Sequence, residues 1–169
     1  MAEVGWSRGS GEGDAALPGN YKVGGWIHTA DFGGHGENFG LYVAAEQMVW
    51  TESPETREQG LGVFARVGGG PEGRSPLPWV IDAGLHYTGL IPGRDGDLTA
   101  VGFVHADIND GRRGHDAFRN YEQVLELTYE VVIRSWWSIQ PDVQWILRPG
   151  GESGPGHAFL IGLRSTVTF

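Results

Sequence analysis

The chain has no cysteine and no run of 18 or more apolar residues. The first absence excludes a disulfide-stapled scaffold, a zinc site built from thiolates and a cysteine nucleophile. The second excludes a transmembrane helix, which needs about 20 predominantly apolar residues in succession. It does not exclude transmembrane β-strands, because each needs only about 9–11 residues that alternate in polarity.

Basic residues are also scarce. Lysine and arginine together number 12 against 21 acidic residues, and the net charge of −9 argues against a nucleic-acid partner. Glycine, by contrast, contributes 29 of the 169 residues, a length that fits one domain. Seven Trp, seven Phe and five Tyr argue against disorder, because burying them offsets the entropy cost of ordering the chain.

Apolar and polar residues alternate along most of the chain. In the clearest segment, Tyr121–Arg134, the odd-numbered positions are mostly apolar and the even-numbered positions carry every charge. This alternation predicts a long strand with two unlike faces. A helix would place Glu122, Glu126 and Glu130 on one side, but the β-branched and aromatic residues that follow favour a strand. The pattern predicts about eight strands, namely Tyr21–Ala30, Leu41–Thr51, Leu61–Val67, Trp79–Tyr87, Leu98–Asp107, Tyr121–Arg134, Ile139–Leu147 and His157–Phe169.

Two arrangements of such strands are open. In a soluble sugar-binding β-sandwich or barrel, the apolar positions would point inward and fill a core. In an outer-membrane barrel, they face lipid and the polar positions line a hydrated lumen. Trp79 and Tyr87 close the two ends of one apolar face, and Phe169 ends another. Aromatic residues at strand ends favour the membrane arrangement, because they form its interfacial girdles.

Seven segments in order resemble the carboxyl-terminal part of the OprB family of carbohydrate-selective porins. They are Gly25–Phe32 (GWIHTADF), Gly40–Trp50 (GLYVAAEQMVW), Gly60–Gly68 (GLGVFARVG), Gly84–Asp97 (GLHYTGLIPGRDGD), the strand with Glu122, Glu126 and Tyr129–Glu130, Ile139–Gly151 (IQPDVQWILRPGG) and Gly162–Phe169 (GLRSTVTF). The resemblance covers residues 20–169, the expected barrel segment. Gly5–Leu17 matches nothing in the family, and we expect residues 1–19 to be poorly ordered or unplaced.

The resemblance implies an all-β, antiparallel transmembrane barrel of about 16 strands in the Gram-negative outer membrane. Sugars would cross it by facilitated diffusion, without catalysis and without a cofactor. We expect the chain to supply the carboxyl-terminal half of that barrel. The implied partners are mono- or oligosaccharides, outer-membrane lipid, the missing amino-terminal half of the barrel and the barrel assembly machinery. That machinery would recognise the terminal strand, which ends in the aromatic Phe169.

Polar positions of the predicted strands supply candidate lumen residues. Carboxylates accept and guanidinium groups donate hydrogen bonds in fixed directions, which suits sugar hydroxyls, and indole rings offer flat apolar faces to sugar rings. The candidates are Arg66, Asp82, Glu122, Glu126, Glu130, Asp142, Arg164, Trp26 and Trp50. For each charge, the alternative is a purely structural role in the barrel wall.

Catalysis and metal binding are not indicated. A glycosidase needs two carboxyl groups about 5–9.5 Å apart. Glutamates four residues apart on one strand lie about 13 Å apart, which is too far. The histidines are scattered without the spacing of metal ligands.

Overall fold

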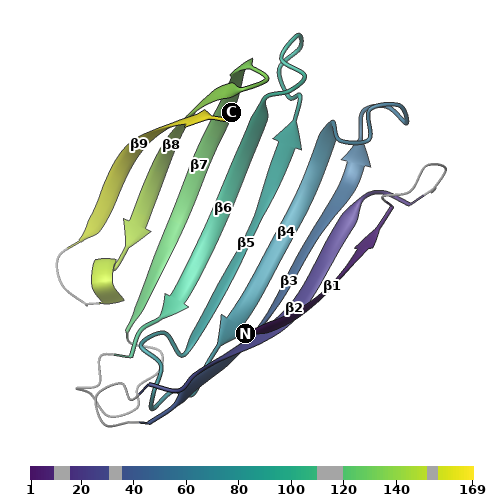
Figure 1. Cartoon of the computed structure of the whole chain (residues 1–169). Coiled ribbons are helices and arrows are strands. Elements are labelled where there is room, and N and C mark those ends of the chain that lie inside the picture. The colour runs from purple at the N-terminus through teal and green to yellow at the C-terminus, as the bar shows by residue number, and fades with distance from the viewer. Residues whose placement is uncertain (10–15, 31–35, 110–119, 152–155) are drawn as a thin grey trace.

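The computed structural model describes residues 1–9, 16–30, 36–109, 120–151 and 156–169. These residues form nine strands and one short 3-10 turn, η1 (Pro149–Gly151) (Figure 1). The strands are β1 (Ala2–Arg8), β2 (Gly19–His28), β3 (Asn38–Thr51), β4 (Gly60–Gly69), β5 (Trp79–Thr88), β6 (Leu98–Asp107), β7 (Tyr121–Arg134), β8 (Trp137–Leu147) and β9 (His157–Val167). No helix in the described residues is long and apolar enough to cross a membrane.

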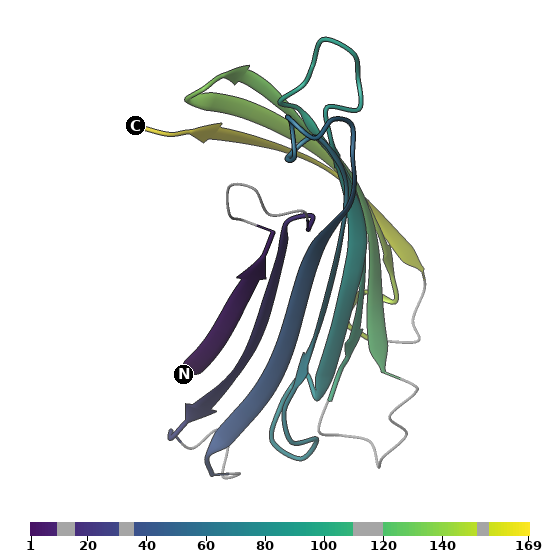
Figure 2. The ribbon, with the colours of Figure 1, turned by 90° about the vertical axis from the view of Figure 1, so that its right-hand side faces the viewer.

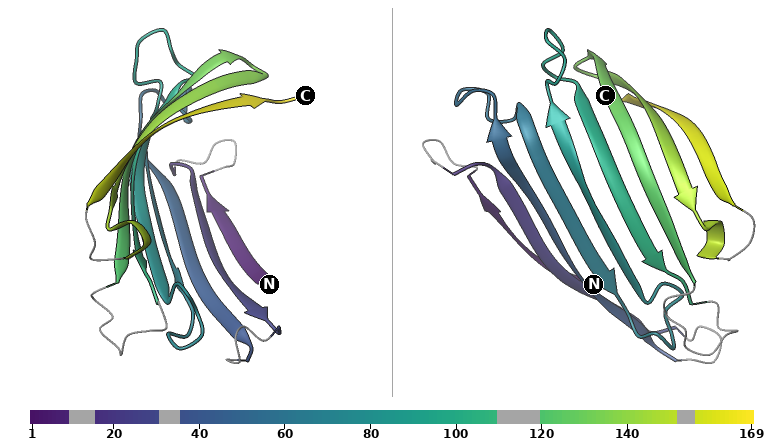
Figure 3. Two further views of the ribbon diagram at one scale, coloured as in Figure 1. Left: turned by 90° about the vertical axis from the view of Figure 1, so that its left-hand side faces the viewer. Right: turned by 180° about the vertical axis from the view of Figure 1, so that it is seen from behind.

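All nine strands belong to one antiparallel sheet in which each strand pairs with its neighbours along the chain. The order runs from β1 to β9, and these two edge strands are not paired with each other. The sheet curls so that both edges lie on the same side of the central strands (Figures 2 and 3). The result is an open trough rather than a closed barrel.

The sheet has no hydrophobic core. Within the described residues, no apolar side chain is buried. The chain exposes 11288 Å² of surface, whereas a compact globular protein of the same mass exposes about 8100 Å². A soluble sandwich requires a second packed layer, which the described residues do not form.

All eight predicted strands are present, and two of them, Leu98–Asp107 and Tyr121–Arg134, have the predicted bounds. The structure differs within residues 1–19, which we expected to be poorly ordered or unplaced. There Ala2–Arg8 forms β1, and the ring of Trp6 stacks on Tyr21 of β2 with centroids 5.3 Å apart. The segment alternates in polarity, but it is short and leads into a glycine-rich stretch. Residues 10–15 of the expected unplaced segment lie outside the described residues.

Candidate functional site

The two faces of the sheet differ in chemistry. The register aligns Leu127 of β7 in one row with Val63, Leu85, Val101, Val143 and Ile161. We call this side the apolar face and the opposite side the polar face. Leu127 is 53% exposed, whereas the next residue, Thr128 on the polar face, is 8% exposed. Side chains on the inner side of a curved sheet converge and shield one another, so this alternation places the polar face on the inside of the trough.

Aromatic side chains gather at both ends of the apolar face. At one end, His105 stacks between Trp79 and Tyr121, with centroid distances of 4.8 and 5.1 Å. At the other end, the rings of Trp50 and Tyr87 lie 6.0 Å apart. Trp79 and Tyr87 therefore mark opposite ends of the same face of β5, as predicted. Outer-membrane barrels carry such aromatic girdles at the two membrane interfaces.

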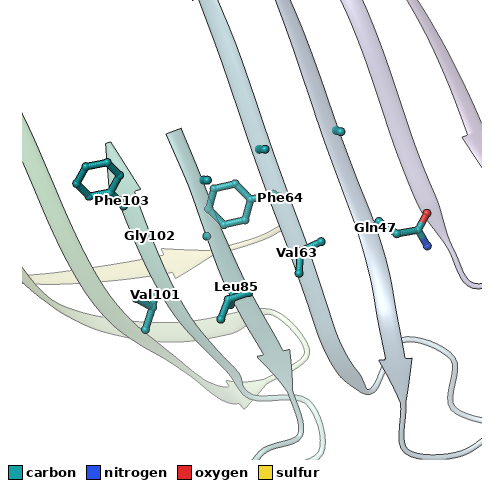
Figure 4. A pocket seen from close by; sticks show the side chains of 11 residues that line it. Gln47, Val63, Phe64, Leu85, Val101, Gly102 and Phe103 are labelled. Atoms are coloured by element: carbon teal, nitrogen blue, oxygen red, sulfur yellow. The ribbon is translucent and has the colours of Figure 1, made fainter. Parts of the chain in front are cut away.

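Figure 4 shows the middle of the sheet. Val63, Leu85, Val101 and Phe103 line a shallow depression on the apolar face. Phe64 follows Val63 in β4 and points to the polar face, where its ring extends across β5. Two phenylalanines on nearby strands thus occupy opposite faces.

Glycines on the polar face accommodate large side chains from the neighbouring strand. A Cβ on Gly84 would lie 2.6 Å from Cε1 and Cζ of Phe64, and a Cβ on Gly40 would lie 2.6 Å from Nε1 of Trp26. Contacts this close do not occur for real Cβ atoms. Glycine therefore lets each ring lie flat along the wall, where any other residue would push it into the trough.

One ion pair and one histidine–carboxylate contact connect β3, β4 and β5 across the polar face. Nε of Arg66 donates to Oδ2 of Asp82 at 2.8 Å, so two predicted candidates form one ion pair. Nε2 of His86 lies 3.4 Å from Oε1 of Glu46, and neither ring nitrogen of this shielded histidine has a hydrogen-bond partner in the described residues. Arg66 and Glu46 are the exposed partners, and they present a donor and an acceptor to the trough.

The predicted glutamates of β7, Glu122, Glu126 and Glu130, lie on the polar face, and we call them the acidic ladder. They differ in their contacts. Glu126 accepts a hydrogen bond from Nε2 of Gln144 at 2.9 Å, and Glu122 accepts one from the backbone N–H of Gly150 at 2.7 Å. Within the described residues, Glu130 makes no hydrogen bond or ion pair. Two carboxylates are therefore fastened to the wall and one is available to solvent or solute.

Asp142 and Arg164 extend the polar face onto β8 and β9. The Asp142 carboxylate lies over Gly162 of β9, and Arg164 pairs in register with Gln140. Neither side chain makes a hydrogen bond or ion pair in the part of the chain that the structure describes. Their polar groups are free to contact solvent or solute.

The two predicted tryptophans lie on opposite faces of the sheet. Trp26 lies on the polar face, over Gly40. Trp50 lies instead on the apolar face, because β3 carries a bulge at which the register shifts from Met48 opposite Gly62 to Trp50 opposite Leu61. The extra residue reverses the side to which the following side chains point. Every other predicted candidate lies on the polar face.

Sequence reasoning missed Phe64, His86 and Glu46. The signal for Phe64 was present, since it shares the strand parity of the candidate Arg66. Its significance depends on the glycine that the register places opposite it, which alternation within one strand does not reveal.

A buried carboxylate fastens the turn between β5 and β6 to β7. Asp97, 3% exposed, accepts hydrogen bonds from Arg94 at 2.7 and 2.8 Å, from the Tyr129 hydroxyl at 2.5 Å and from the Val132 backbone N–H at 2.9 Å. Burial alone would raise the pKa of Asp97, but these hydrogen bonds together hold it below its ordinary value. The turn is thus locked by an ionised side chain.

No group of three or more histidine, aspartate or glutamate residues in the described segments is arranged to hold a metal ion.

Comparisons with known proteins agree with this geometry. A family model described as "Carbohydrate-selective porin, OprB family" matches residues 32–169. Porin B of Pseudomonas aeruginosa is 24% identical over 190 aligned residues, which cover 90% of this chain and 42% of that porin. The high-pH structure of Pseudomonas putida OprB matches with a TM-score of 0.81 and 24% identity, over 99% of this chain and 47% of that one. The low-pH structure matches with a TM-score of 0.65 and 22% identity, over 96% and 44%.

The chain spans just under half the length of these relatives. The family model nevertheless covers most of the chain itself, from residue 32 to its last residue. The chain therefore belongs to the OprB family of carbohydrate-selective porins.

Proposed function

We propose that the chain forms part of the wall of a water-filled channel in the Gram-negative outer membrane, through which carbohydrates diffuse. The observation that carries this proposal is the contrast between the faces: exposed Leu, Val, Ile and Phe side chains on one, and ion pairs and carboxylates on the other. Lipid would cover the apolar face, and water and sugar would contact the polar face. The role requires no catalysis and no cofactor.

Completion of the barrel follows from strand direction. With nine antiparallel strands in chain order, β1 and β9 run the same way. Closure by antiparallel pairing therefore requires an odd number of further strands, which makes the total even, as in bacterial barrels. A channel of about 16 strands needs about seven more. A second copy would supply nine strands, which is an odd number, but in the same membrane orientation its edge strands run parallel to β1 and β9 and do not pair with them in the antiparallel sense.

The acidic ladder supplies a direct test of the channel. Replacing Glu122, Glu126 and Glu130 by glutamine in the complete barrel should leave it folded, because glutamine preserves the size of each side chain. Ion selectivity should shift away from cations, since the lumen loses three negative charges. Reversal potentials in a salt gradient measure the selectivity, and liposome swelling with glucose measures sugar flux, which should also change.

Glu52→Gln is the matched control, because this glutamate lies just beyond the end of β3 and binds the Tyr87 hydroxyl. If a folded triple variant kept the parental selectivity and flux, the ladder would not line the conducting path. If the parental barrel did not swell liposomes in glucose, the carbohydrate function itself would be contradicted.

The carboxyl-terminal residue supplies a second test. Phe169 follows β9 and is fully exposed. We propose that the barrel assembly machinery recognises this terminal aromatic strand. Deleting Phe169 should lower the amount of heat-modifiable barrel in the outer membrane, while Phe169→Tyr should preserve it. Equal amounts of folded barrel in all three proteins would leave Phe169 without a role in assembly.

A further inference from the structure

We propose that Phe64 is the floor of a carbohydrate subsite in the channel wall, at which one face of a sugar ring stacks on the phenyl ring. This inference rests on the proposed carbohydrate function and goes beyond it, because it assigns a position and a mode of contact. We call the Phe64 ring, together with the glycines beneath it, Gly84 and Gly102, the Phe64 platform.

The geometry of the platform leaves one ring face open. Phe64 extends from β4 over Gly84 of β5, and its Cζ would lie 3.8 Å from a Cβ on Gly102 of β6. The ring therefore rests on bare backbone across two strands and is only partly buried. Its second face is directed into the trough.

Phe64 is an aromatic ring among small and charged neighbours. Its neighbours along β4 on the same face are Gly62 and Arg66, and its row continues through the two glycines to Glu126. Exposing an aromatic face to a hydrated lumen costs free energy that contact with an apolar surface recovers. A pyranose ring supplies that surface through its C–H groups, which carry slight positive charge and are attracted to the negative face of an aromatic ring.

Polar groups lie in the rows on either side of the platform. The Arg66–Asp82 pair occupies the next row on one side, and His86, 3.4 Å from Glu46, occupies the next row on the other. Both ring nitrogens of His86 are shielded from solvent, so the acceptor on this side of the platform is the exposed carboxylate of Glu46. An apolar floor with donors and acceptors at its edges matches the chemistry of a sugar ring.

The test is the block of ion current by glucose in planar bilayers containing the complete barrel. Phe64→Leu and Phe64→Met remove the flat ring and should raise the half-blocking glucose concentration about three- to tenfold, which is the weight of one aromatic contact. Phe64→Tyr should stay within about twofold of the parent. Phe103→Leu is the matched control, since Phe103 lies on the apolar face two strands away.

Mannitol, which has a similar mass but no ring, separates stacking from a change in pore width. The platform requires that block by mannitol is unaltered in every variant that retains parental conductance. If Phe64→Leu and Phe64→Met matched Phe103→Leu in glucose block, the platform would be rejected while the carbohydrate channel stood. If glucose did not block the parental barrel although liposomes containing it swelled in glucose, the platform alone would be contradicted. Absence of both block and swelling would contradict the carbohydrate function as well.

Discussion

The Leu163→Arg substitution is expected to destabilise the membrane-inserted barrel by about 2–4 kcal/mol, because it places a cation among lipid chains near the middle of β9. Leu163 lies on the apolar face and is 74% exposed. Leu160, in the same strand but on the polar face, is 50% exposed. Leu160→Arg directs the same new side chain into the lumen and should be tolerated.

The pair is matched in residue type and strand, and both side chains are exposed, so that the main difference is the face. Urea unfolding of both variants in lipid vesicles, followed by the mobility of the folded form in gels, gives the two free energies of unfolding. Equal losses for the two variants would contradict the assignment of lipid to the apolar face.

Asp97→Ala is expected to cost about 2–3 kcal/mol, because it leaves the Val132 N–H and the Arg94 guanidinium without their acceptor in the turn between β5 and β6. Asp95→Ala, an exposed position in the same turn, should change the free energy of unfolding by less than about 0.5 kcal/mol. The difference between the free energies of unfolding of the two variants measures how much the Asp97 hydrogen bonds contribute to stability.

The stabilisation by the Asp97 carboxylate should be lost only in acid. The folded-state pKa of Asp97 is lowered, so its contribution is fully present above the unfolded value of about 3.9 and is lost as the pH falls through the folded value. The stability difference between parent and Asp97→Ala should therefore be constant above about pH 5 and decline only in stronger acid. A difference that instead faded on raising the pH from 5 to 8 would show that the ionised carboxylate is not what fastens the turn.

Alternation of polarity was sufficient to predict most of the strands. β7 has the predicted bounds because its period of two is clear, and β6, whose alternation is weaker, has them because the turn-rich segment up to Asp97 precedes it. β1 was missed because its seven residues give a short pattern, and because its pairing with β2 depends on contacts such as that between Trp6 and Tyr21.

The candidate site was predictable only where the odd or even position of a residue along its strand (its parity) determines the face on which its side chain lies. Parity placed the charges of β4, β5 and β7 on the correct face, because no bulge interrupts these strands before them. It failed for Trp50, since the bulge in β3 reverses the face and leaves no mark in the alternation. It also could not find the Phe64 platform, because that feature exists only when the register places Gly84 and Gly102 beside the ring.

We propose that water wets the polar face and that lipid covers the apolar face. The absence of cysteine from this chain permits a direct measurement, in which single cysteines replace Val124, Leu125, Glu126 and Leu127 of β7. A charged, membrane-impermeant thiol reagent requires a hydrated thiolate to react. In the membrane-inserted barrel, cysteines at 124 and 126 should react at least about tenfold faster than those at 125 and 127. Equal rates along the strand, or faster reaction at 125 and 127, would contradict the claim.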